Sequence, residues 1–180
     1  MIVRLIQNNR GFTLMETIIS IMIFGIIGIL LVGIIGAGAN VYESIFNSKE
    51  IKDNLYLAQR RLNNDLFGLR DIQNISYADK TTITFTNSRL ETIQYRYDTG
   101  KLYRSISGEG EYLIAQYLTD STRFFYYTVG DSIINQDPLT SSSILSIWQV
   151  RLDLYATKGS ESMKIRTTTF PQNLKYGVVK

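Results

Sequence analysis

The sequence predicts an α+β protein in which a long N-terminal helix packs on an antiparallel β-sheet head. Three observations predict this class. Residues 17–42 contain no charged side chain, as is typical of a helix that crosses a membrane. Residues 43 to about 72 place apolar side chains at helical spacing. From about Ser76 onward, apolar and polar residues alternate with the period of a strand. We therefore expect a transmembrane half and an amphipathic half of one helix before the sheet.

The uncharged run is long enough to cross a membrane, because a bilayer core needs about 20 apolar residues as a helix. Neither proline nor a loop cluster separates this run from the amphipathic stretch. A single helix is therefore predicted from about Thr13 to about Leu69. A small globule cannot enclose a helix of that length, so its first half is expected in lipid or in a bundle of copies. Arg4 and Arg10 precede the run and predict a cytoplasmic N-terminus.

The second half of the predicted helix carries one apolar stripe, which is expected to cover the buried face of the sheet. Residues off the stripe are mostly polar. Among them, Arg61 and Asp65 stand four positions apart, a spacing that allows a weak ion pair. The stripe consists of Leu55, Ala58, Leu62, Leu66, Leu69 and Ile72.

The rest of the chain is predicted to form strands. Asp-Thr-Gly at residues 98–100 indicates a hairpin turn, residues 158–162 indicate another turn, and residues 130–143 indicate a long polar loop. The expected strands are residues 81–87, 92–98, 99–106, 111–118, 123–129, 146–156 and 162–170.

The strand predicted at residues 146–156 alternates clearly, so one of its faces is expected to be buried under the helix and the other to be wet. The expected buried face holds Trp148, Val150, Leu152 and Leu154. The expected wet face holds Gln149, Arg151, Asp153 and Tyr155.

Composition argues against catalysis. The 180 residues include neither Cys nor His, which removes thiol nucleophiles, disulfides, soft metal ligands and the commonest acid–base side chain. The sequence contains no P-loop pattern, and without His or Cys the familiar nucleophile–base arrangements cannot form. We therefore expect no enzymatic activity, no cofactor and no small-molecule substrate.

Acidic side chains and arginines form two kinds of candidate binding site. Glu109 and Glu111, and also Asp131 and Asp137, lack the fuller ligand spacing of a calcium loop, so solvated turns are favoured and no metal is expected. Arg96, Arg104 and Arg123 lie beside many tyrosines and could bind DNA by charge and stacking. An exposed sheet face is the favoured interpretation of that alternation. The net charge of +3 is small and does not by itself indicate nucleic-acid binding.

The stretch Gly-Phe-Thr-Leu-Met-Glu at residues 11–16 precedes the apolar run instead of following it. An ordinary secretory signal has the opposite order. Together with the short basic leader, this pattern resembles the class III signal of type IV prepilins. The resemblance implies that a prepilin peptidase cuts between Gly11 and Phe12 and methylates the new amine of Phe12. It divides the chain into a leader at residues 1–11, a transmembrane assembly helix at 12–42 and an extracytoplasmic head at 43–180.

Glu16 is the only carboxylate near the start of the apolar run. A charged side chain at mid-bilayer costs roughly 2.5–3.5 kcal/mol, whereas an α-amine with a pKa near 8 is mostly cationic at neutral pH. In a bundle of helices, Glu16 can pair with the Phe12 amine of a neighbouring subunit and select the register between helices. The competing interpretation is an interfacial glutamate that the helix dipole stabilises.

Five glycines interrupt the apolar run. Gly33 stands where major pilins often carry a proline, and Gly25 and Gly28 precede it. Glycines allow close packing of helices in membranes. They also weaken a helix, so residues 25–38 could partly unwind when the subunit leaves the membrane. Both interpretations stay open at this point.

The head resembles the PilW and type II secretion J-type minor pilins. This resemblance implies a subunit at or near the filament tip that helps to start assembly with other pilins or pseudopilins. Some relatives carry disulfides in the head, so the lack of Cys is a departure that leaves a competence pseudopilin as a sister interpretation. The matching residues are Tyr95, Tyr97, Asp98, Leu102, Arg104, Leu113, Ala115, Phe124 and Tyr126.

Other destinations for the chain remain as alternatives. Ala37-Gly38-Ala39 is a passable site for ordinary signal peptidase, which would release a domain beginning at Asn40. A plain membrane anchor or an exported adhesin or DNA-binding module is the rival class. The favoured prediction is a single-pass membrane protein that later joins a filament at the cell surface or in the periplasm. Adhesion, motility, secretion and DNA uptake are all compatible with it.

Overall fold

A computed structural model describes residues 13–69 and 71–170 of the chain. The chain divides into two units, residues 1–43 and residues 44–180, and the second is called the head below. The helix α1 (Leu14–Phe67) is continuous and contributes residues to both units. The prediction of one long helix from about Thr13 to about Leu69 is confirmed, as is the α+β class.

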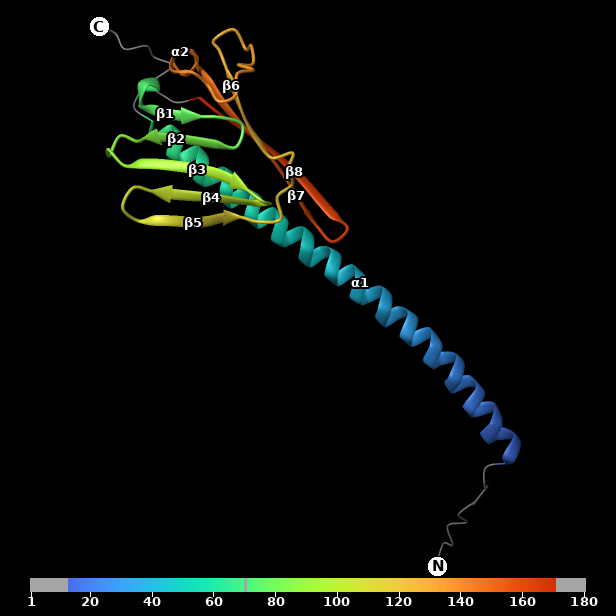
Figure 1. The fold of residues 1–180 in the computed structure, drawn as a ribbon. Helices are drawn as coiled ribbons and strands as arrows, with labels where there is room; N and C mark the ends of the chain where they lie inside the picture. The colour runs from blue at the N-terminus through green and yellow to red at the C-terminus, as the bar shows by residue number, and fades with distance from the viewer. Residues whose placement is uncertain (1–12, 70, 171–180) are drawn as a thin grey trace, which may run out of the picture. The chain divides into compact units, whose positions relative to one another are not determined.

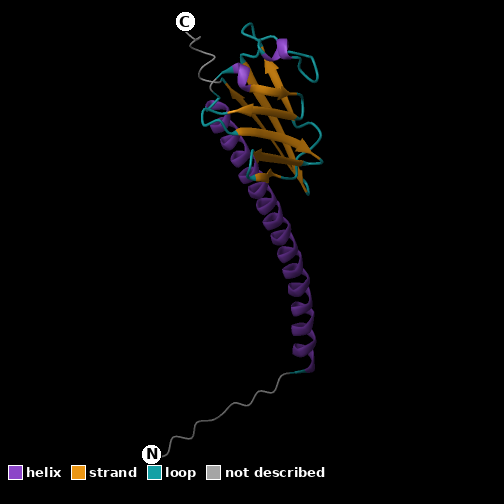
Figure 2. Cartoon of the chain, turned by 60° about the vertical axis from the view of Figure 1, so that its left-hand side comes forward, coloured by secondary structure: helices purple, strands orange, loops and turns teal. Residues whose placement is uncertain are grey.

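The head contains two antiparallel sheets, which Figure 1 shows as separate sets of labelled strands. Figure 2 shows the strands of the head and the long helix by type of secondary structure. In both sheets each strand pairs with its neighbour in sequence. The larger sheet consists of β1 (Ile75–Ala78), β2 (Thr82–Thr86), β3 (Thr92–Asp98), β4 (Lys101–Ile106) and β5 (Gly110–Ala115). The smaller sheet consists of β6 (Arg123–Tyr127), β7 (Gln149–Lys158) and β8 (Glu161–Thr169).

Three short elements were not predicted. They are β1, a 3₁₀ turn at Ile72–Asn74, and the helix α2 (Ser141–Ile144), which extends from the predicted polar loop at 130–143. Thr140 caps α2 by accepting a hydrogen bond from the N–H of Ser143, and Ile144 is buried. Elements of three or four residues are too short to show a period, and tertiary contacts decide them.

The predicted hairpin turn after β3 is confirmed. Asp98 pairs with Lys101, and the two residues between them have left-handed backbone conformations, with φ of 46° at Thr99 and 78° at Gly100. Turns of this kind match the twist of the flanking strands. A Cβ atom at Gly100 would lie 3.1 Å from the carbonyl oxygen of Leu118, so this position favours glycine on steric grounds as well.

One hydrophobic core joins the helix to both sheets. The predicted stripe is buried from Leu55 to Leu69, and Ile51 extends it by one turn. Ile72 is only partly buried. The largest buried partners from the sheets include Ile83, Phe85, Ile93, Tyr95 and Leu102 of the larger sheet and Phe124, Tyr126, Val150, Leu152 and Leu154 of the smaller.

The prediction for the two faces of β7 is partly wrong. Val150, Leu152 and Leu154 are buried as expected, but Trp148 precedes the strand and is only half-buried. Asp153, expected on the wet face, is 3% exposed. Arg166 donates two hydrogen bonds of 3.0 Å to its carboxylate, and a carboxylate can be buried when cations and hydrogen bonds compensate its charge.

Candidate functional site

The start of α1 places Glu16 in the first turn of the helix. The side chain of Thr13 accepts a hydrogen bond from the N–H of Glu16 at 3.3 Å, and the carbonyl oxygen of Thr13 accepts one from the N–H of Thr17 at 3.2 Å. The bond to the Thr13 side chain satisfies one of the donors that a helix start leaves unpaired, and the bond to its carbonyl is the first within the helix. Glu16 is exposed, and a negative charge here is favoured by the helix dipole. A pairing partner from another chain stays a prediction.

The part of α1 that follows Glu16 is apolar on all sides. An 18-residue window has a mean hydropathy of 3.1, and none of it is buried within the chain. Large apolar side chains between Leu14 and Ile35 are 44–81% exposed. At 1.5 Å per residue, residues 17–42 extend about 39 Å, more than the roughly 30 Å of a hydrocarbon core. A surface of this kind is stable where lipid or other helices cover it.

The glycines of this helix have no steric role within the chain. A Cβ atom at Gly25, Gly28 or Gly33 would meet nothing within 4 Å, and the same holds for Gly36 and Gly38. The helix is continuous through all five. A requirement for glycine must therefore come from another molecule or from a change in the helix itself.

We predict that residues 25–38 exchange their backbone hydrogens faster than the flanking helix in assembled filaments. Glycine lowers helix stability by about 1 kcal/mol per residue relative to alanine, and five occur in this short stretch. Hydrogen exchange measured by mass spectrometry on filaments checks this expectation, and a variant with Gly25 and Gly28 replaced by alanine serves as the control. Full protection of residues 25–38 in the unmodified filament would favour the close-packing role instead.

The two residues of the predicted processing site, Gly11 and Phe12, lie outside the described residues. Both processing roles therefore stay predictions.

Within the head, Asp65 ties α1 to the larger sheet. Its carboxylate accepts hydrogen bonds from Arg104 at 2.7 and 3.2 Å and from the hydroxyl of Tyr95 at 2.5 Å. The predicted pair with Arg61 is therefore replaced by a pair with a strand residue. Burial, and then the nearby charge of Asp65, raises the pKa of Tyr95, so this hydroxyl stays a donor. The hydrogen bond from Arg104 to Asp65 likewise raises the pKa of the guanidinium.

The turn between β7 and β8 is attached to α1 by two carboxylates. Glu161 accepts hydrogen bonds from Ser44 at 2.6 Å and from Ser48 at 3.0 Å. Glu50 pairs with Lys158 on the other side of the turn. Hydrogen bonds from the two serines lower the pKa of Glu161, and the hydrogen bond from Lys158 lowers the pKa of Glu50. We call these five residues the hairpin clamp.

The hairpin clamp is expected to weaken in acid. A carboxylate whose pKa is lowered by folding stabilises the fold above its ordinary pKa, which is 4.5 for Glu161, and this contribution disappears as the pH falls through the lowered value. Replacing Glu161 with glutamine should therefore lower the melting temperature of the full chain in nonionic detergent at pH 7, with the difference shrinking as the pH falls below 4.5. Circular dichroism melts provide the measurement.

The matched control for the hairpin clamp is Glu109→Gln. Glu109 is exposed at the turn between β4 and β5, and its replacement should leave the melting temperature unchanged at both pH values. If Glu161→Gln lowered the melting temperature equally at pH 7 and in acid, the hairpin clamp would not depend on the charge of the Glu161 carboxylate.

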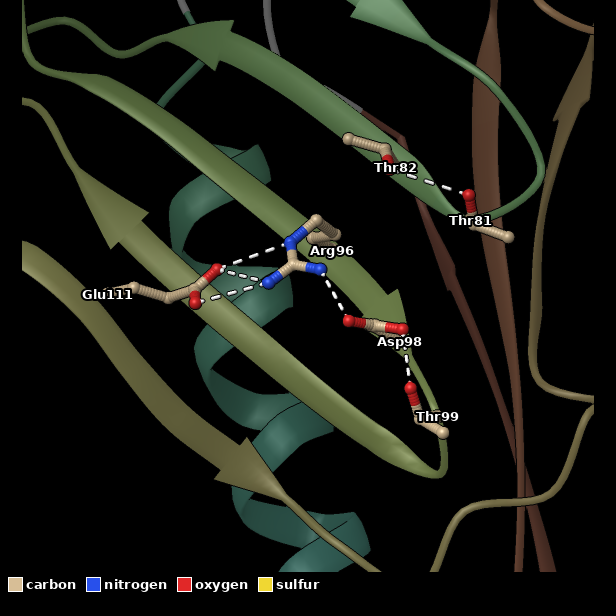
Figure 3. Close-up of polar contacts among 6 residues, drawn as sticks. All are labelled: Thr81, Thr82, Arg96, Asp98, Thr99 and Glu111. Atoms are coloured by element: carbon tan, nitrogen blue, oxygen red, sulfur yellow. Dashed lines mark hydrogen bonds and ion pairs between the residues drawn. The ribbon is translucent and has the colours of Figure 1, made fainter.

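Arg96, one of the arginines considered for DNA binding, is held by carboxylates on the larger sheet (Figure 3). It donates to Glu111 at 3.0 and 3.2 Å through Nη2 and to Asp98 at 2.8 Å through Nη1. Arg104 is engaged by Asp65. The expectation that these arginines and tyrosines form one exposed face is thus wrong for Arg104 and Tyr95, because both turn toward α1. Arg123 lies on the smaller sheet.

No group of three or more metal-binding side chains occurs in the described ranges, residues 13–69 and 71–170. Of the candidate calcium ligands, Glu111 pairs with Arg96 and Asp137 pairs with Lys80 at 2.9 Å. These carboxylates are used within the head.

The residues that carry the resemblance to PilW and J-type minor pilins are mostly structural. Tyr95, Leu102, Ala115, Phe124 and Tyr126 are buried in the core. Leu113 is instead half exposed. The hydroxyl of Tyr97 donates to Asp120 at 2.9 Å, and Asp98 and Arg104 form the ion pairs described above. The pattern therefore encodes strand packing and polar contacts of the head.

Several contact residues were missed by the sequence-based predictions. Ser44, Glu50 and Glu161 were not singled out, although Glu161 lies in the predicted turn at 158–162. The only local signal was that two charged residues, Lys158 and Glu161, lie on either side of Gly159. Their partners lie more than 100 positions away, so no short-range pattern could identify them.

These features define a protein whose first helix is long and apolar enough to cross a membrane and whose head is α+β. Residues 6–32 match the family model described as the prokaryotic N-terminal methylation motif. This range includes Gly11, Phe12 and Glu16. The match supports a type IV pilin-like or pseudopilin-like protein carrying a class III signal. No curated protein matches the chain.

Proposed function

We propose that this chain is a minor pilin or pseudopilin, a structural subunit of a type IV pilus or of a type II secretion-like filament. The observation that carries the proposal is the methylation motif at residues 6–32, which leads directly into an exposed apolar helix. The same helix continues without a break into the core of the head. A secretory signal that is removed whole needs no such continuation.

The proposed assembly step uses two residues of the motif. Cleavage after Gly11 leaves Phe12 with a methylated amine, which remains cationic at neutral pH. Glu16 follows four residues later, in the exposed first turn of α1. When apolar helices pack side by side, the carboxylate of Glu16 in one subunit accepts the amine of Phe12 in its neighbour. Each pair removes two unpaired charges from a low-dielectric bundle.

The proposed topology follows from the same helix. Residues 1–11 form the leader, residues 12–42 span the membrane before assembly, and residues 43–180 lie outside the cytoplasm. Arg4 and Arg10 keep the N-terminus on the cytoplasmic side, where the prepilin peptidase acts. After assembly the subunit resides in a filament at the cell surface or in the periplasm. Its partners are other pilins or pseudopilins, and its role is structural.

A position at or near the filament tip, with a role in starting assembly, is the finer part of the proposal. It is supported by the resemblance of the head to PilW and J-type minor pilins. Of the residues that carry this resemblance, Tyr95, Phe124 and Tyr126 are buried in the core of the head, and Arg104 pairs with Asp65.

N-terminal sequencing of the protein from cells tests the proposed function. We expect a chain that begins at Phe12 and carries one extra methyl group on its amine. Replacing Gly11 with leucine should leave the leader attached, because the peptidase needs a small side chain before the cut. A chain beginning at Asn40 would instead indicate ordinary signal peptidase, and one beginning at Met1 would indicate a plain anchor. Either result contradicts the proposal.

A further inference from the structure

The smaller sheet has one face in the core and a second face directed away from it. On β6 and β7 the core residues alternate with the residues of this second face. The pairing register then places Arg166 and Lys164 of β8 on this second face, because Arg166 lies opposite Asp153 and Lys164 lies opposite Tyr155. We call this face the outer face of the smaller sheet. Its charged and aromatic members are Arg123, Phe125, Tyr127, Arg151, Asp153, Tyr155, Lys164 and Arg166.

The outer face of the smaller sheet carries more cations than anions. Residues 44–180 contain seventeen Lys and Arg and fourteen Asp and Glu, which leaves a net charge of +3. The outer face holds four of these cations and one of these anions, so its own net charge is also +3. The remaining thirteen cations and thirteen anions balance. The outer face is therefore a positively charged surface of the head.

One side chain of the outer face, the carboxylate of Asp153, holds two of the cations in place. The guanidinium of Arg166 is fixed by its two hydrogen bonds to Asp153, and Arg151 lies 3.2 Å from the same carboxylate. The side chain of Asp153 is only 4% exposed, whereas that of Arg166 is 51% exposed. The buried anion thus positions cations above it without presenting its own charge to solvent.

The aromatic rings of the outer face are already occupied by cations of the chain. Arg151 stacks on Phe125 at 4.3 Å and on Tyr127 at 5.0 Å, and Lys164 lies 4.6 Å from the ring of Tyr155. Rings covered in this way are not free to stack on the bases of a single strand. A partner of this face is therefore recognised by its negative charge.

We propose that the outer face of the smaller sheet binds double-stranded DNA through the phosphate backbone. Arg123, Lys164 and Arg166 are exposed and come from the two edge strands of a three-stranded sheet, so they span about two strand spacings, roughly 10 Å. Duplex DNA carries one charge per about 1.7 Å of its axis, so its phosphates are dense enough for each of these cations to contact one. An acidic protein would instead need carboxylates placed to match. The inference goes beyond the filament role and does not depend on assembly.

Salt dependence of binding provides the test, with the full chain in nonionic detergent and a fluorescent DNA duplex. If three phosphates are contacted, a plot of the logarithm of the binding constant against the logarithm of the salt concentration should have a slope of about −2.7. Replacing Arg123 and Lys164 with glutamine should change this slope to about −0.9 and weaken binding at 50 mM salt on the order of 100-fold. Fluorescence anisotropy measures both quantities.

The control variant carries Lys49→Gln and Lys101→Gln, which removes the same total charge from other exposed positions. It should keep the original slope. An equal loss in the control would assign binding to overall charge and overturn the proposal. Tighter binding of single-stranded DNA than of the duplex would overturn the proposal in favour of base stacking. Displacement of the duplex by polyglutamate at equal charge concentration would overturn it in favour of an acidic protein partner. A duplex that does not bind at 50 mM salt would also overturn it.

Discussion

Replacing Glu16 with alanine is expected to reduce the amount of this subunit in purified filaments by about tenfold or more. In the proposed filament, the variant leaves the amine of a neighbouring Phe12 without its carboxylate in an apolar bundle. Removing one member of a buried ion pair costs roughly 3–5 kcal/mol, and 1.4 kcal/mol already corresponds to a factor of ten in an equilibrium. Immunoblots of sheared filaments, normalised to the subunit in the membrane, measure the effect.

Glu43→Ala is the matched control for Glu16. Glu43 is the next carboxylate along α1, at the other end of the uncharged run, and it is exposed. Its replacement should leave incorporation unchanged. N-terminal sequencing of both variants separates assembly from processing, since cleavage before Phe12 should continue in each. Normal incorporation of the Glu16→Ala protein would show that the dipole interaction at the helix start is the whole role of Glu16.

Replacing Asp65 with alanine is expected to destabilise the head by about 2–4 kcal/mol, which lowers the melting temperature by about 10 °C. The substitution leaves two donors, the guanidinium of Arg104 and the hydroxyl of Tyr95, without the acceptor that both share. The side chains of Arg104 and Asp65 are only 14% and 19% exposed, so water replaces the lost bonds poorly. Circular dichroism melts of the full chain in nonionic detergent measure the change.

Asp53→Ala controls for the loss of a carboxylate from the same helix. Asp53 is exposed on α1, and its substitution should change stability by no more than about 0.5 kcal/mol. Combining Asp65→Ala with Arg104→Ala should cost less than the sum of the two single substitutions, because both remove the same interaction. Additive losses would indicate that Asp65 and Arg104 stabilise the head independently of each other.

Much of the fold was predictable because it depends on local patterns. The stripe from Leu55 to Leu66 has helical spacing, so its burial followed from period alone. The turn at residues 98–100 was predictable because Gly100 needs a positive φ. The candidate assembly residue Glu16 was likewise evident, since a single carboxylate beside an apolar run is rare.

Contacts between distant residues were not predictable in the same way. The sequence predicts a pair between Asp65 and Arg61, one helical turn away. In the structure Asp65 instead accepts a hydrogen bond from Arg104, which is 39 positions away. Arg104 approaches from a strand and makes two hydrogen bonds in a site shielded from water, whereas a pair on an exposed helix surface gains little. Proximity in sequence was therefore a poor guide to the partner of a buried charge.

The amino-acid sequence by itself determined the class III motif, the uncharged helix, the amphipathic stripe and most strands, because each depends on residue type and spacing over a few turns. Only the tertiary structure decided that the strands divide into two sheets. The N–H of Leu118 donates to Gly100 of the larger sheet, and the next N–H, that of Thr119, donates to Tyr155 of the smaller. The tertiary structure also decided that Asp153 is buried and that four cations from three strands share the outer face of the smaller sheet. These features depend on which strands become neighbours, and that choice is made by packing against α1 over long distances in the chain.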